Sequence, residues 1–247
     1  MIRSFKKFAD YINSYRKKRD DITCSLNPII EKNNCKKILE VGCNVRPVCN
    51  KNNIKSKSFI LHGIDPELNI DLSVAKTKFD YFEITDLESY ETSEKYDLIL
   101  LNMVLEHIKD NKKSFKKLSS LISENGIIVC HQPSNLHPFS IINRVLSHKL
   151  KEKVLKIFLP WSKKGARGWK SYYDRCNYFG FKKLCEINQL EIINERFNYN
   201  AAHYFSFFPP LFLIIVLYEE FIKLLNIKLL CSDFYLEIAH KNRNKLS

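Results

Sequence analysis

Five short apolar runs, each bounded by turn residues, constrain the fold of this 247-residue chain more than any other feature. We predict that they are β-strands at residues 37–41, 59–64, 79–84, 96–101 and 126–130. A helical pattern separates the last two runs, with apolar residues on one face and lysines on the other. Near-continuous apolar strands that alternate with helices are typical of a parallel sheet covered on both faces. The sequence therefore predicts an α/β fold.

The part of the chain after residue 170 continues this pattern. We predict a helix at 171–188 and two further strands at 191–197 and 234–239. The chain length suits one large α/β domain, which we place at 34–242. Residues 1–33 are predicted to precede it as an amphipathic helical segment, because aromatic and aliphatic residues recur there at helical spacing among Lys and Arg.

Two insertions are predicted within this domain. The first, at about 135–170, is irregular and basic, and we interpret it as a lid. The second, at about 201–230, begins with the uncharged stretch 201–218. A spanning helix is not expected there, because only eight residues separate Pro210 from Glu219 and a spanning helix needs about twenty apolar residues. Two interpretations stay open: a buried helical element, or one that rests on a membrane or contacts an apolar substrate.

The net charge of +13 is patterned along the chain. Residues 61–110 carry 4 basic and 12 acidic residues, a balance of −8, whereas residues 1–60 and 111–200 are strongly basic. Such basicity fits a polyanionic partner, but the abundance of Lys and Asn is equally what a compositional bias produces. The eight cysteines form no C-x-x-C pair and no signal peptide is evident at the N-terminus, so we expect a reducing, cytoplasmic setting.

Polar and small residues that suit nucleotide-like ligands follow the ends of the first four predicted strands. Carboxyl ends of parallel strands share one edge of a sheet, where open α/β sheets bind such ligands. An acid after the second strand is placed to accept hydrogen bonds from ribose hydroxyls. In chain order these residues are Glu40, Gly42, Cys43 and Asn44, then Asp65 and Pro66, then Asp86 and Leu87, then Asn102 and Met103.

Together these motifs, at spacings of roughly 20 residues, resemble the class I S-adenosylmethionine-dependent methyltransferases that carry a Leu-Glu-His motif, here residues 105–107. The resemblance implies a Rossmann-like seven-stranded sheet, mostly parallel with an antiparallel last strand, and helices on both faces. It implies S-adenosyl-L-methionine as the cofactor. The turn from Glu40 to Gly42 would hold its methionine end, Asp65 its ribose and Asp86 its adenine, with Leu87 beside the ring. Asn102 would lie near the methionine part.

The first motif departs from the family pattern. Asn44 and Arg46 stand where the second and third glycines of the turn are usual. The ligand end at this turn is an amino acid and not a pyrophosphate, so the need for bare backbone is weaker. A dinucleotide oxidoreductase is disfavoured, since the G-x-G-x-x-G motif is absent and no tyrosine in the expected region is followed by Lys four residues on.

Two histidines are candidate general bases. His107 follows the fourth predicted strand and His131 the fifth, so both are expected on the edge that carries the cofactor motifs. A base is useful when the methyl acceptor is a hydroxyl. We expect no metal, because Met103 stands where some quinone-biosynthesis relatives have the glutamate that partners Glu106.

The sequence thus predicts an enzyme, an S-adenosylmethionine-dependent methyltransferase. We expect O-methylation of a glycan, of a lipid-linked acceptor or of another partly apolar small molecule, with peripheral membrane contact through 201–218 at the inner face of the membrane. One alternative is an RNA-binding or RNA-modifying protein with the same fold, based on Trp161 and Trp169 among basic residues. Another is an inactive relative that acts at a membrane surface.

Overall fold

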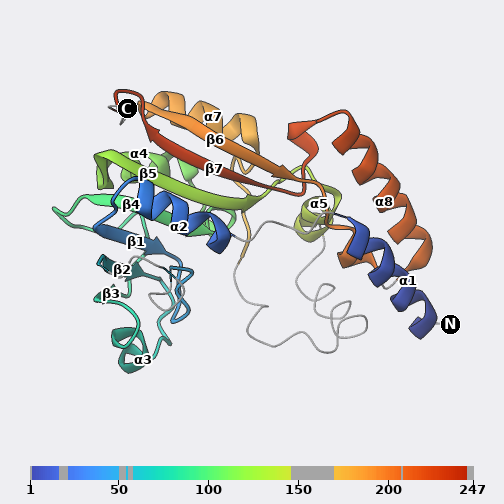
Figure 1. Ribbon diagram of the computed structural model, residues 1–247, viewed down its shortest axis with the longest axis horizontal. Coiled ribbons are helices and arrows are strands. Elements are labelled where there is room, and N and C mark those ends of the chain that lie inside the picture. The colour runs from blue at the N-terminus through green and yellow to red at the C-terminus, as the bar shows by residue number, and fades with distance from the viewer. Residues whose placement is uncertain are drawn as a thin grey trace.

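The strands form one mixed sheet in the order β3-β2-β1-β4-β5-β7-β6 (Figure 1). The computed structural model describes residues 2–16, 22–49, 54, 58–145, 170–206 and 208–243. Within these residues the strands are β1 Lys37–Val41, β2 Ile60–Ile64, β3 Tyr81–Glu83, β4 Tyr96–Asn102, β5 Ile122–Pro133, β6 Leu190–Asn198 and β7 Asp233–His240. The predicted strands are thus found, and β5 extends further at both ends than the apolar run indicated.

The direction of the last strand agrees with the expected fold. β1 pairs in parallel with both β2 and β4, and β4 pairs in parallel with β5. β7 runs antiparallel to β5 on one side and to β6 on the other. The sheet is therefore Rossmann-like, mostly parallel with an antiparallel last strand, as predicted. The carboxyl ends of β1, β2, β4 and β5 lie along one edge.

Helices cover both faces of this sheet (Figure 1). The helices of the described residues are α1 Ile2–Tyr15, α2 Ile22–Lys32, α3 Leu72–Lys76, α4 Asn111–Leu121, α5 Pro138–Val145, α7 Tyr178–Ile187 and α8 Pro209–Leu224. Of these, α1 and α8 lie beyond one end of the sheet (Figure 1). The 3-10 turns found among the described residues are η1 Leu105–His107, η3 Ala202–Phe205 and η4 Lys228–Leu230.

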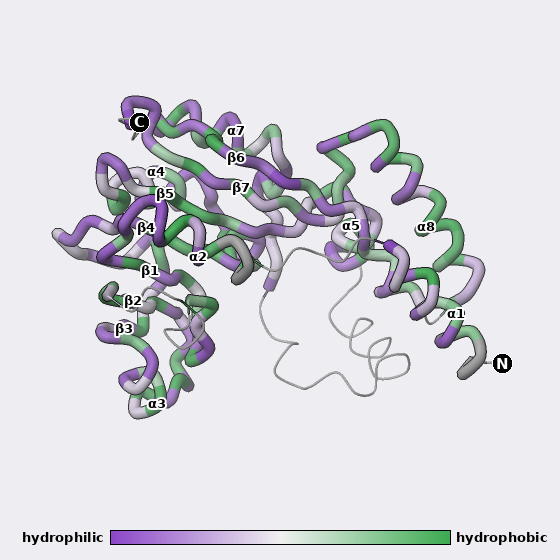
Figure 2. Tube along the Cα trace, viewed as in Figure 1, coloured by the Kyte–Doolittle hydropathy of each residue, from purple (hydrophilic) through white to green (hydrophobic). Residues whose placement is uncertain are grey.

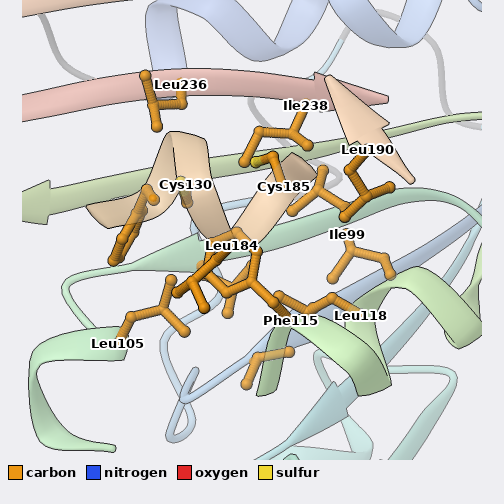
Figure 3. Close-up of a cluster of buried hydrophobic side chains, with 14 of the residues drawn as sticks. Ile99, Leu105, Phe115, Leu118, Cys130, Leu184, Cys185, Leu190, Leu236 and Ile238 are labelled. Atoms are coloured by element: carbon orange, nitrogen blue, oxygen red, sulfur yellow. The ribbon is translucent and has the colours of Figure 1, made fainter. Parts of the chain in front are cut away.

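Alternating residues of the central strands supply two separate cores. In β4, Ile99 and Leu101 face the core that holds α4 and α7, whereas Leu98 and Leu100 face the core that holds α2. This period of two is why strands that are buried on both faces are apolar throughout. Figure 3 shows the first core, where Phe115 and Leu118 of α4 lie near Leu184 and Cys185 of α7. All seven cysteines with described side chains are buried and free.

The helix predicted at 171–188 begins later than expected, at Tyr178. Asn177 caps it, since its side-chain oxygen accepts a hydrogen bond from the Gly180 N–H at 2.9 Å. Before this cap, Tyr173 and Arg175 have φ of 53° and 54°, which a helix does not accommodate. Residues 170–177 are therefore a loop that turns at residues 174 and 175.

The two predicted insertions differ in how far the structure describes them. In the first, residues 138–145 form α5, whereas the basic stretch 146–169, with Trp161 and Trp169, lies outside the described residues. The lid and the basis of the RNA alternative therefore stay predictions. The second is helical: η3, α8 and η4 follow β6 and precede β7 in the sequence.

Helix α8, in the insertion at about 201–230, is buried on one face and exposed on the other. Its inner face packs with η3 and α1 in a third apolar cluster, through Phe212 and Ile215. Its other face is exposed and includes Ile214, Leu217, Phe221 and Leu224. Figure 2 shows hydrophobic residues along much of α8. No helix among the described residues is long and apolar enough to cross a membrane.

Candidate active site

A cleft of about 380 Å³ opens at the carboxyl ends of β1, β2 and β4. This volume lies within the range that is common for small-molecule and cofactor sites. Six of the predicted cofactor-binding residues line it, namely Gly42, Asp65, Pro66, Asp86, Leu87 and Met103. The candidate base His107 lines it as well. The strand-end motifs, which are distant in sequence, are therefore brought together as the sequence predicts.

Gly42 has a conformation and a neighbour that both exclude a side chain. Its φ is +66°, in the left-handed region. A Cβ at this position would lie 2.6 Å from Cγ2 of Val104. The bare backbone at the end of β1 therefore keeps this wall of the cleft open.

Replacing Gly42 with alanine is expected to lower the free energy of unfolding by about 2–3 kcal/mol, because left-handed strain and overpacking add. Chemical denaturation measures the change. In a Val104→Ala background the steric part disappears, so Gly42→Ala should then cost less. An equal cost in both backgrounds would contradict the packing argument.

Asn44 adopts the backbone conformation for which the family usually has glycine. Its φ is +46°, and Asn is one of the few other residues that tolerate this region. Its backbone N–H donates to Oδ2 of Asp65 at 2.7 Å, and its side-chain oxygen accepts from the Val45 N–H at 2.7 Å. Asn44 can therefore take the place of glycine, and its backbone hydrogen bond links the turn after β1 to Asp65 at the end of β2. Asn44 lies beside the cleft wall.

Asp65 is buried at the end of β2 and lines the cleft. Oδ1 accepts a hydrogen bond from the Glu67 N–H at 2.9 Å, and Oδ2 accepts the bond from Asn44. An ionised carboxylate can accept about four hydrogen bonds, so two backbone donors orient it and leave capacity for a ligand. Pro66 follows on the same wall.

Glu40, in β1, binds the backbone of the segment that follows the turn. Oε1 accepts from the Val48 N–H at 2.6 Å and Oε2 from the Cys49 N–H at 3.1 Å. Burial raises the pKa of Glu40 from 4.5 to about 7, while these two hydrogen bonds oppose the shift. The neighbouring Cys43 is also buried, and its thiol donates to the Ile64 carbonyl at 3.7 Å. Contacts of Glu40 or Cys43 with a cofactor stay predictions.

The raised pKa of Glu40 makes stability depend on pH. Between pH 4.5 and 7 the unfolded chain ionises Glu40 while the folded chain keeps it protonated, so stability falls as pH rises. The expected fall is on the order of 3 kcal/mol. Urea unfolding at both ends of this range should show a smaller fall for Glu40→Gln than for the wild type. The exposed Glu124→Gln is the control, and identical pH dependence in all three proteins would refute the assignment.

Asp86 and Leu87 follow the end of β3 and line a further part of the cleft. Oδ1 of Asp86 accepts a hydrogen bond from the Ser89 N–H at 2.7 Å, and Asp86 lines the cleft. Glu88 also lines the cleft, and burial raises its pKa. Leu87 is buried and supplies an apolar surface. This wall suits a flat, partly polar ring.

Asn102 does not line the cleft but contacts His131. Its Oδ1 lies 3.1 Å from Nδ1 of His131, and Nε2 of His131 lies 2.8 Å from Oδ1 of Asp233. Oδ2 of Asp233 accepts hydrogen bonds from the Asn198 side chain and from the Ser232 hydroxyl. Because a carboxylate only accepts, Nε2 of His131 carries a proton. A histidine oriented by a buried carboxylate therefore lies beside Met103, at the end of β5.

His107 is held differently. Its Nδ1 lies 3.1 Å from the Lys170 carbonyl and 3.3 Å from the Ser171 hydroxyl, and its Nε2 is 3.8 Å from Oε1 of Glu106. Burial lowers the pKa of His107, while the bond with Lys170 opposes this shift. His107 is therefore a neutral side chain of the cleft wall.

Sequence reasoning missed several residues of the cleft and its surroundings. Val104, Ile108 and Tyr172 line it, and no local motif marks them. Tyr172 is held at the cleft by a contact between distant segments, in which its N–H donates a hydrogen bond to the Glu106 carbonyl at 2.7 Å. Asp233 had one available signal, namely an acid at the start of the last strand. Within the described residues no group of three or more His, Cys, Asp or Glu side chains is arranged to hold a metal ion.

Comparisons with known proteins agree with this geometry. The sequence matches a family model described as a methyltransferase domain over residues 8–200. A search of curated proteins finds no match.

The fold is similar to that of solved methyltransferases at low sequence identity. An S-adenosylmethionine-dependent methyltransferase from Clostridium acetobutylicum has a TM-score of 0.53 at 14% identity, covering 96% of this chain and 99% of that one. A SAM-dependent methyltransferase from Archaeoglobus fulgidus has 0.52 at 15%, covering 94% and 98%. The plantazolicin methyltransferase BamL, solved with a triazolic desmethylPZN analog and SAH, has 0.52 at 15%, covering 90% and 84%. Because the family model covers most of the sequence, this chain belongs to that family of methyltransferase domains.

Proposed function

We propose that the cleft binds S-adenosyl-L-methionine and that the protein transfers its methyl group to a hydroxyl of a glycan, a lipid-linked acceptor or another partly apolar small molecule. The observation that carries the proposal is the position of Asp65, a buried carboxylate oriented by two backbone donors on the cleft wall. The BamL complex with SAH supports the choice of cofactor.

The cleft residues fit this cofactor in chemical type. Asp65 suits the two ribose hydroxyls, Asp86 suits the adenine amino group and Leu87 suits the ring face. The bare backbone of Gly42 gives a ligand close access, since a Cβ would be 2.6 Å from Val104. The acidic residues at the cleft favour a ligand that carries a sulfonium and an ammonium charge.

The chemistry that the cofactor supplies is a methyl group already activated on a sulfonium. The protein then has to align donor and acceptor and to exclude water. For a hydroxyl acceptor we assign proton removal to His131. Asp233 holds the Nε2 proton, so Nδ1 is the nitrogen that accepts. In this structure Oδ1 of Asn102 lies 3.1 Å from Nδ1, so the acceptor hydroxyl reaches Nδ1 only after the Asn102 side chain turns away from His131.

Isothermal titration of the full chain with S-adenosyl-L-methionine and with S-adenosylhomocysteine tests the proposal. We expect one site for each, with NAD as a control that does not bind because the cleft lacks a phosphate-binding glycine motif. No heat with either methionine-derived ligand would overturn the function. Transfer of a labelled methyl group to a lipid and glycan extract then tests the acceptor class, since a methyl ether survives both acid and base.

A further inference from the structure

Helix α8 presents a continuous apolar stripe to solvent. Ile214, Leu217, Phe221 and Leu224 recur at helical spacing and are 61%, 71%, 60% and 83% exposed. Leu213 and Phe208, which directly precedes α8, are also exposed and extend this apolar surface at the N-terminal end of the helix. Monomeric proteins rarely leave such a contiguous apolar surface uncovered unless it contacts a partner or a membrane. We call these four residues the α8 stripe.

The α8 stripe is not an inner face left open by poor packing. The opposite side of α8 is buried, through Phe212, Ile215 and Ile222. Glu219 on that side is fully buried, with Oε2 2.7 Å from the guanidinium of Arg16 and Oε1 3.3 Å from Nε2 of His137. Such a buried ion pair fixes the rotation of α8 about its axis. The α8 stripe therefore faces solvent because the opposite side of the helix is fixed against the protein.

Helix α1 lies against α8 and carries further exposed aromatic rings. Phe5 contacts Phe212 edge to face, with ring centroids 5.7 Å apart, and Figure 1 shows the two helices beyond one end of the sheet. On α1, Phe8, Tyr11 and Tyr15 are exposed at 44%, 59% and 74%. Exposed Tyr and Phe on an amphipathic helix are typical of the water-lipid interface.

The charge of this part of the chain identifies the occupant. Helix α1 contains Arg3, Lys6 and Lys7 and a single acid, Asp10. Lys17, Lys18 and Arg19 follow it in the sequence, before Asp20 and Asp21, whereas Arg16 is held in its buried ion pair with Glu219. A basic amphipathic helix beside an apolar stripe matches the anionic surface of a bilayer, where apolar burial and attraction to anionic headgroups add. Helix α8 has 16 residues and does not reach the length of a spanning helix. We propose that α1 and the α8 stripe hold the protein on an anionic membrane surface.

This placement has a consequence for the acceptor, which rests on the proposed function. Helix α5 follows the carboxyl end of β5, and η3 and α8 follow that of β6. Phe139 of α5 stacks on Tyr204 of η3 with centroids 4.1 Å apart, so these segments form one layer next to the edge that carries His131. The acceptor class is then a hydroxyl carried by a lipid or a lipid-linked glycan. Such a molecule reaches the cleft from the membrane surface.

Flotation of the full chain with vesicles tests the membrane contact without an acceptor or a cofactor. We expect the wild type to float with vesicles of phosphatidylcholine and phosphatidylglycerol, more weakly with phosphatidylcholine alone, and less as salt rises. Leu217→Glu and Phe221→Glu should each lower the vesicle-bound to free ratio by at least about tenfold. Both side chains are exposed, so neither change disturbs the core.

The matched control is Ile187→Glu, an exposed aliphatic residue at the end of α7 that should leave flotation unchanged. Absence of flotation, or equal flotation of Leu217→Glu and wild type, overturns the proposal. A wild-type dimer by light scattering that Leu217→Glu dissociates, without any flotation, assigns the stripe to a second copy and also overturns it. Calorimetric binding of S-adenosylhomocysteine should be the same in all variants, so failure here is separate from failure of methyl transfer.

Discussion

Asp65→Ala is expected to weaken binding of S-adenosylhomocysteine by about 10²–10⁴-fold. Two hydrogen bonds from ribose hydroxyls to a charged carboxylate are lost, each worth about 1.5–3 kcal/mol. The site cannot compensate with water at low energy, because Asp65 is buried at the end of β2. Isothermal titration of wild type and variant under one set of conditions measures the ratio.

Two controls separate a lost ligand contact from a damaged turn. Asp71, like Asp65, lies between β2 and β3, but its carboxylate caps α3 and does not line the cleft. The affinity of Asp71→Ala for S-adenosylhomocysteine should therefore match that of the wild type. Asp65→Asn keeps the shape of the side chain and one strong acceptor for the Asn44 N–H. An affinity near that of wild type for Asp65→Ala, in a variant that melts normally, would remove Asp65 from the cofactor site.

His131→Gln is expected to lower the rate of methyl transfer at saturating cofactor by at least about 10²-fold, the low end of what a general base contributes. Glutamine keeps a polar side chain between Asn102 and Asp233 but cannot take up a proton. The rate of labelled methyl incorporation into the lipid and glycan extract measures the effect, and cofactor affinity should change little.

A comparison with His107 and Asp233 distinguishes a base from a structural residue. His107→Gln should affect cofactor affinity more than rate, since His107 lines the cleft. Asp233→Asn should lower the rate and shift its dependence on pH, because the pair at 2.8 Å loses its charge. If His131→Gln lost only thermal stability and kept its rate, the assignment of the base would be wrong.

Local pattern accounts for most of what the sequence predicted correctly. Strand positions follow from short apolar runs, and the residues after those runs necessarily reach one edge of a parallel sheet. Gly42, Asp65 and Asp86 could therefore be placed together without any structure. Their exact partners could not, because Asn44 had to be seen in its left-handed conformation to explain why it replaces glycine.

Contacts between distant segments were beyond local reasoning. Asp233 meets His131 across 102 residues, and Tyr172 reaches the cleft only through the backbone of Glu106. Helix α8 posed a different difficulty, since a run that is apolar throughout does not reveal which face is covered. The burial of Glu219 with Arg16 settles that question only once α1 is in place.

The position of β7 has a consequence for synthesis on the ribosome. Among the strands of the described residues it is the last in sequence, yet it lies between β5 and β6 and pairs with both. A nascent chain that has not yet exposed residues 233–240 leaves β5 with an open edge and β6 without a strand partner. Open edges of this kind invite pairing with other chains. The sheet and the His131–Asp233 pair are therefore completed only after residues 233–240 have left the ribosome.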